Sequence, residues 1–77
     1  PAKVALSKLG SALEAYALQD DLVKAKAELR AADEIIHWLP DDGRKGTTAR
    51  LRSAAAGLGG VIERDEAQRA DKPQEGR

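Results

Sequence analysis

Apolar residues recur at helical spacing through the middle of the chain. Seven of them follow one another at alternating intervals of four and three: Leu18, Leu22, Ala25, Leu29, Ala32, Ile36 and Leu39. This spacing places all seven on one side of a helix. Pro40 cannot continue helical hydrogen bonding, and the Asp41-Asp42-Gly43 sequence behind it favours a turn. We therefore predict a long helix over about residues 11–39 that ends at this turn.

A second apolar row follows the turn. It consists of Leu51, Ala54, Ala55, Leu58, Val61 and Ile62, and it predicts a helix over about residues 48–67. Thr47 or Thr48 can cap its N-terminus with a hydroxyl group, and Asp65 with Arg69 forms an i,i+4 ion pair on its outer side. The fold class is therefore all-α: an antiparallel helical hairpin in which residues 40–46 fold one leucine row back onto the other.

The apolar pattern changes phase before the long row begins. Leu6, Leu9, Leu13 and Tyr16 form one stripe, whose continuation would fall on Asp20. Either the helix turns a different face to a different neighbour near residues 19–21, or it breaks there. We expect a continuous helix with two contact faces. A short N-terminal helix over residues 3–9 is a further expectation, because Gly10 suits a helix end and Ser11 with Glu14 fits a capping box. The alternative is one continuous helix over about residues 3–39 that contains Gly10.

The size of the chain favours self-association. It has 77 residues, enough for a single domain over residues 1–69 with a flexible polar tail at 70–77. It has no Cys and one His, so neither disulfides nor a structural zinc site can supplement so small a core. Oligomerisation is the remaining common remedy. We expect a homo-oligomeric helical bundle, with a monomer as the alternative.

Charge and hydropathy restrict the partners. The 13 basic and 13 acidic residues cancel, whereas nucleic-acid-binding domains are usually basic. Arg44, Lys45, Arg50 and Arg52 lie close in sequence, but Arg50 and Arg52 point about 200° apart on a helix and present no common face. No segment is long and apolar enough to be a membrane span or a signal peptide. We expect a cytoplasmic protein that binds neither nucleic acid nor membrane, and Pro1 is compatible with a whole protein that has lost its initiator Met.

One loop has the composition of an anion site. Residues 43–48 combine two glycines, two cations and two hydroxyl groups at a predicted helix N-terminus, where backbone N–H groups and the helix dipole attract phosphate. The candidate ligand-binding residues are Arg44, Lys45, Thr47, Thr48 and Arg50. The loop is not a Walker A motif, because Lys45 precedes Gly46 and no strand is predicted before it. The alternative is a flexible polar turn with a Thr cap.

Small and aromatic residues mark candidate interfaces. Ser53, Gly57 and Gly60 share one strip of the last helix, which would allow close helix packing or, alternatively, the approach of a ligand to the backbone. Trp38 either closes the end of the hairpin core or, if exposed, contacts a partner. The predicted interface residues are Leu6, Leu9, Leu13, Tyr16, Trp38, Ser53, Gly57 and Gly60. No catalytic constellation surrounds His37, and the paired acidic residues lack metal-ligand spacing. We expect a non-enzymatic regulator, adaptor or inhibitor that needs no cofactor or metal and binds a protein partner; the alternatives are an anion or nucleotide receptor and a nucleic-acid-binding protein.

Overall fold

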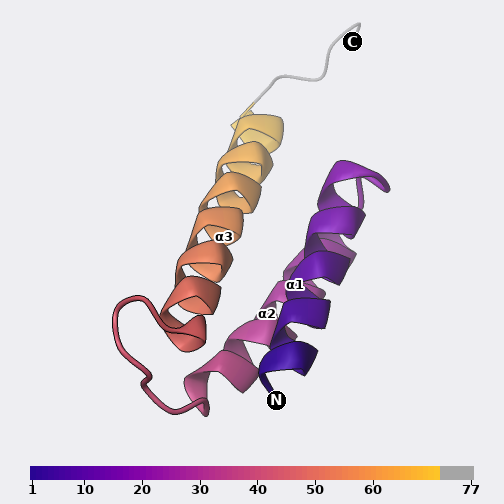
Figure 1. The fold of residues 1–77 in the computed structure, drawn as a ribbon. Helices are drawn as coiled ribbons and strands as arrows, with labels where there is room; N and C mark the ends of the chain where they lie inside the picture. Colours follow the sequence, from indigo (N-terminus) through magenta and orange to yellow (C-terminus); the bar gives the residue numbers. More distant parts are fainter. Residues whose placement is uncertain (72–77) are drawn as a thin grey trace, which may run out of the picture.

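A computed structural model describes residues 1–71, which form three helices and no strand. Helix α1 spans Ala2–Ala17, α2 spans Leu22–His37 and α3 spans Thr47–Asp71. Helices α1 and α2 form an antiparallel pair, and α3 runs back along it (Figure 1). The start of α1, the end of α2 and the loop before α3 lie at the same end of the molecule. The all-α class is confirmed, as a bundle of three helices.

A turn separates α1 from α2, so the prediction of one continuous helix over residues 11–39 was wrong. Asp20 has a positive φ of 51°, a conformation that Asp tolerates better than most residues. Asp21 then caps α2, because its side chain accepts a hydrogen bond from the Lys24 backbone N–H at 3.0 Å. The change of phase in the apolar pattern therefore marks a reversal of the chain rather than a change of contact face.

Helix α1 is continuous through Gly10, so there is no separate N-terminal helix over residues 3–9. Ser11 lies inside this helix and does not cap a new one. A Cβ atom added at Gly10 would meet nothing within 4 Å. The alternative of one continuous helix over residues 3–39 is right in placing Gly10 inside a helix but wrong in its extent, because that helix ends at Ala17.

The core between the helices is built mainly from alanine. Helices α1 and α2 share the most extensive contact in the fold, and small side chains let two helices approach closely along their length. Six alanines are buried together with five larger residues: Ala5, Ala12, Ala15, Ala25, Ala32 and Ala55, with Leu9, Leu29, Ile36, Leu51 and Ile62. Four of the seven positions in the predicted long row are buried, and Leu18, in the turn, is exposed.

The predicted fold-back at residues 40–46 is confirmed. Leu51, Ala55 and Ile62 of α3 are buried in the same core as the α2 row, whereas Ala54 and Val61 are exposed. A Cβ atom at Gly59 would lie 3.3 Å from Cδ2 of Leu29, which shows how closely α3 approaches α2 there. Helix α3 continues to Asp71, beyond its predicted end near residue 67, and residues 72–77 of the predicted tail lie outside the described part of the chain.

Ion pairs connect the helices at the surface. Lys26 Nζ lies 2.9 Å from Glu66 Oε2, and Lys8 Nζ lies 3.4 Å from Glu28 Oε1. Arg69 of α3 pairs with Asp20 in the α1–α2 turn and with Asp65 one turn earlier, which confirms the predicted i,i+4 pair. Partly exposed pairs of this kind contribute at most about 1 kcal/mol each. None of the helices over residues 1–71 is long and apolar enough to cross a membrane.

Candidate interaction groove

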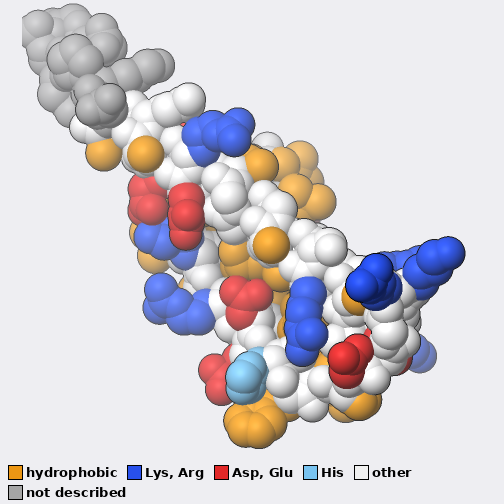
Figure 2. All heavy atoms as spheres, turned by 90° about the vertical axis from the view of Figure 1, so that its left-hand side faces the viewer, with side chains coloured by type: hydrophobic (Ala, Val, Ile, Leu, Met, Phe, Trp, Pro, Cys, Tyr) orange, Lys and Arg blue, Asp and Glu red, His pale blue; other side chains and the backbone are white. Residues whose placement is uncertain are grey.

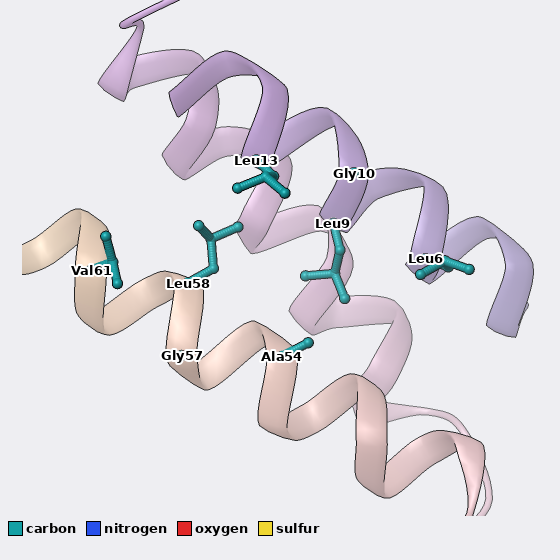
Figure 3. A pocket seen from close by; sticks show the side chains of 8 residues that line it. All are labelled: Leu6, Leu9, Gly10, Leu13, Ala54, Gly57, Leu58 and Val61. Atoms are coloured by element: carbon teal, nitrogen blue, oxygen red, sulfur yellow. The ribbon is translucent and has the colours of Figure 1, made fainter. Parts of the chain in front are cut away.

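A groove with an apolar lining separates α1 from α3. Its volume is about 550 Å³, and it is open to solvent along one side. The lining residues are Leu6, Leu9, Gly10 and Leu13 of α1 with Ala54, Gly57, Leu58 and Val61 of α3. In Figure 3, Leu9 and Leu58 point into the space between the two helices. The groove is a surface without charged side chains in a chain of which 34% is charged.

The groove exists because α3 covers only part of the α1–α2 pair. The contact between α1 and α3 is the smallest of the three helix–helix contacts. Leu6 consequently remains 61% exposed and Leu13 53% exposed, although both carry side chains large enough for a core. Neighbouring exposed leucines rimmed by polar residues are typical of interaction surfaces.

Two of the residues that line the groove are glycines, one on each helix. Gly10 on α1 and Gly57 on α3 both have free space where a Cβ atom would be. Glycine inside a helix costs about 1 kcal/mol relative to alanine. No contact within residues 1–71 requires glycine at either position, and both leave helical backbone accessible from the groove.

The structure brings together four of the eight predicted interface residues. Leu6, Leu9, Leu13 and Gly57 line the groove. Ser53 and Gly60 are exposed on α3 but lie outside the groove lining. The apolar stripes of α1 and α3 therefore meet at one surface, although the sequence placed them on separate faces.

Tyr16 packs against the core near the C-terminal end of α1, beyond the groove residues. Its ring is partly buried there. The hydroxyl group donates a hydrogen bond to Asp65 of α3, and this bond, followed by desolvation, raises the pKa of Tyr16 above its ordinary value. The two carboxylates of Asp20 and Asp65 raise the pKa of the Arg69 guanidinium in turn. Tyr16 and Arg69 together fasten α3 to the end of the α1–α2 pair.

Trp38 lies just beyond the end of α2, away from the groove. Its side chain is 75% exposed. Its ring packs edge-on against His37, with centroids 5.1 Å apart and planes at 83°. The single His side chain, pale blue in Figure 2, lies near one end of the molecule beside a hydrophobic side chain. This pair is a small exposed aromatic surface separate from the groove.

The predicted anion loop is occupied by a carboxylate of the chain itself. The backbone N–H of Thr48 donates hydrogen bonds to Asp42 Oδ1 at 3.2 Å and Oδ2 at 3.4 Å. Asp42 thus takes the position at the start of α3 where an anion would bind. Of the predicted ligand residues, Arg44, Lys45, Thr47 and Arg50 are exposed, and Thr48 is buried.

The Thr48 hydroxyl has a different role from the one predicted. It donates a hydrogen bond to the Pro40 carbonyl oxygen at 2.8 Å, and so ties the loop to α3 instead of accepting from the helix N-terminus. A Cβ atom at Gly46 would overlap the carboxyl group and backbone oxygen of Asp42. Glycine at position 46 therefore gives Asp42 room to cap the helix.

Several residues of these sites escaped sequence reasoning. Ala54 and Val61 were assigned to the inward row of α3, yet both are exposed and line the groove. Leu58 of the same row packs against the core as predicted and also lines the groove. The spacing of Ala54, Gly57 and Val61 by three and four was a signal that these residues share a face. Asp42 was read as a turn residue, and its distance of six residues from Thr48 matches no standard capping pattern.

Potential metal ligands do not cluster in residues 1–71. Within this part of the chain, no three His, Cys, Asp or Glu side chains converge as they would around a metal ion. No protein-family model, curated protein sequence or solved structure matches the chain.

Proposed function

We propose that this is a small non-enzymatic binding protein, a regulator, adaptor or inhibitor, that acts through its helical surface as a homo-oligomer. The observation that carries the proposal is the groove between α1 and α3. It offers almost only apolar side chains to solvent, including the half-exposed Leu6 and Leu13. Burying such a surface contributes about 25 cal/mol for each Å² of apolar area.

The distribution of large apolar residues supports the same proposal. In the described part of the chain, residues 1–71, five large apolar side chains are buried, and seven are exposed: Val4, Leu6, Leu13, Leu18, Val23, Trp38 and Val61. A chain of this size gains little stability from its own core. Association with another helical surface would bury part of what the single chain leaves in water.

The test uses two matched substitutions on exposed large residues. Leu13→Asp places a charge in the groove, and Val23→Asp places one on α2, where Val23 is exposed and does not line the groove. We expect Leu13→Asp to abolish self-association and the capture of protein partners, and Val23→Asp to preserve both. Sedimentation equilibrium and affinity capture are the measurements. If both variants match the wild type in both measurements, the groove is not the functional surface.

The anion or nucleotide receptor is a weaker proposal. A phosphate group at the start of α3 would have to displace Asp42 from the Thr48 N–H, and would meet the repulsion of that carboxylate. A thermal-shift screen with phosphate-bearing ligands separates the two functions, because a ligand at 100 times its dissociation constant stabilises a protein by about 2.7 kcal/mol. Nucleic-acid binding would instead fall steeply with salt.

A further inference from the structure

The groove is lined on both walls by residues at the spacing of a helix–helix seam. On α1, the groove residues Leu6, Gly10 and Leu13 follow at intervals of four and three. Ala17, four residues further on and outside the groove lining, continues this row, and all four residues are exposed. On α3, Ala54, Gly57 and Val61 follow at intervals of three and four. Such spacing keeps a row of side chains facing a partner helix. The shape of the groove therefore suits a helix lying along it.

The chain itself contains a helix suited to this groove. The exposed row of α1 alternates large Leu6 and Leu13 with small Gly10 and Ala17. In an antiparallel pair of α1 helices whose two-fold axis passes between positions 11 and 12, Leu13 of each copy faces Gly10 of the other. Leu6 likewise faces Ala17. Large side chains then meet small ones at each of these positions, as an isologous interface requires.

We infer that the groove binds α1 of a second copy of this chain, in a two-fold antiparallel arrangement that places Leu13 of each protomer over Gly10 of the other. The inference deepens the proposed function, on which it rests. It accounts for the glycine at position 10, where a Cβ atom would meet nothing in residues 1–71 but would lie in the path of the partner's leucine. The zero formal net charge means that two copies carry no net repulsion.

Cross-linking tests the geometry directly, because the chain has no Cys and any introduced thiol is unique. Glu14→Cys places a thiol at the exposed rim of the α1 row, near the inferred axis, and Ala27→Cys places one at an exposed position of α2 outside the groove. A short bis-maleimide is expected to join two Glu14→Cys protomers and to leave Ala27→Cys as single chains. Cross-linking through Ala27→Cys instead would overturn the inference.

A substitution at Gly10 provides an independent test with two readouts. Gly10→Ala adds a methyl group where the single chain has free space, and alanine favours the helix. The isolated protomer should keep its fold and helix content by circular dichroism. The dimer dissociation constant should rise about tenfold or more, since a loss of about 1.4 kcal/mol changes an equilibrium tenfold. Dimerisation that is unaffected by Gly10→Ala contradicts the inferred interface.

The outcomes for this inference and for the proposed function can be told apart. A dimer that cross-links at Glu14→Cys and weakens with Gly10→Ala supports both. A dimer insensitive to both Gly10→Ala and Leu13→Asp overturns the inference but leaves self-association intact. A wild-type protein that is monomeric at all concentrations overturns the inference and the homo-oligomeric part of the proposed function. Loss of partner capture by Leu13→Asp in that monomer would still support the groove as a binding surface for a different protein.

Discussion

The carboxylate of Asp42 accepts hydrogen bonds from the backbone N–H of Thr48, at 3.2 and 3.4 Å, and thereby caps the longest helix of the fold from six residues away. The Thr48 hydroxyl simultaneously holds the Pro40 carbonyl. One contact joins a loop carboxylate to the α3 backbone, and the other joins a hydroxyl group of α3 to the loop backbone. They fix where α3 begins, and so help to set its position beside α1.

Removing this cap should destabilise the fold. Asp42→Ala leaves the Thr48 N–H without its acceptor, and the loss of a helix N-cap costs about 1 kcal/mol. We expect a lower midpoint in urea denaturation with an unchanged slope. Asp41→Ala is the matched control, because Asp41 accepts from the Gly43 N–H outside the helix. Equal destabilisation by the two substitutions would show that the helix cap contributes no more to stability than the hydrogen bond within the loop.

Glycines 59 and 60 should respond differently to alanine. A Cβ atom at Gly60 meets open space, so Gly60→Ala should raise the free energy of unfolding by about 1 kcal/mol. At Gly59 the Cβ atom would lie 3.3 Å from the Leu29 side chain, and the gain should be smaller. Thermal unfolding of the two variants gives the comparison. If Gly60→Ala weakens self-association, Gly60 belongs to an interface after all.

The Tyr16–Asp65 hydrogen bond predicts a stability that declines in alkaline solution. The pKa of the Tyr16 hydroxyl group is raised above its ordinary value of 10.0 in the folded protein. The stabilisation is therefore fully present below that ordinary value and is lost as the pH rises through the folded-state pKa. Since Tyr16 is the only Tyr, ultraviolet absorbance can follow its ionisation directly. Asp65→Asn should bring the midpoint down, and an unchanged midpoint would contradict the hydrogen bond.

The fluorescence of Trp38 can test whether its side chain is exposed to solvent. Trp38 is the only Trp in the chain and is 75% exposed, so its fluorescence should be quenched readily by iodide. Trp38→Ala should change the free energy of unfolding by less than about 0.5 kcal/mol, as is usual for surface residues. Protection from iodide in the associated protein would instead place Trp38 in an interface, as the sequence led us to expect.

The sequence alone determined the all-α fold and the reversal at Pro40. Both follow from local rules, since helical spacing of apolar residues and the backbone chemistry of Pro and Gly act over a few positions. The row from Leu22 to Leu39 and the buried row of Leu51, Ala55 and Ile62 were both read correctly. Local reasoning also located the site of the α1–α2 reversal, at residues 19–21, but favoured a continuous helix there, which was wrong.

Only the tertiary structure decided that Asp20 and Asp21 form a turn, which converts one expected helix into two. A change of apolar phase is compatible with a turn or with a second contact face, and the packing of α1 against α2 selects the turn. The groove is likewise a property of the packing. Leu13 and Gly57 are far apart in sequence and line one surface because α3 covers α1 only in part, and that depends on the relative positions of whole helices.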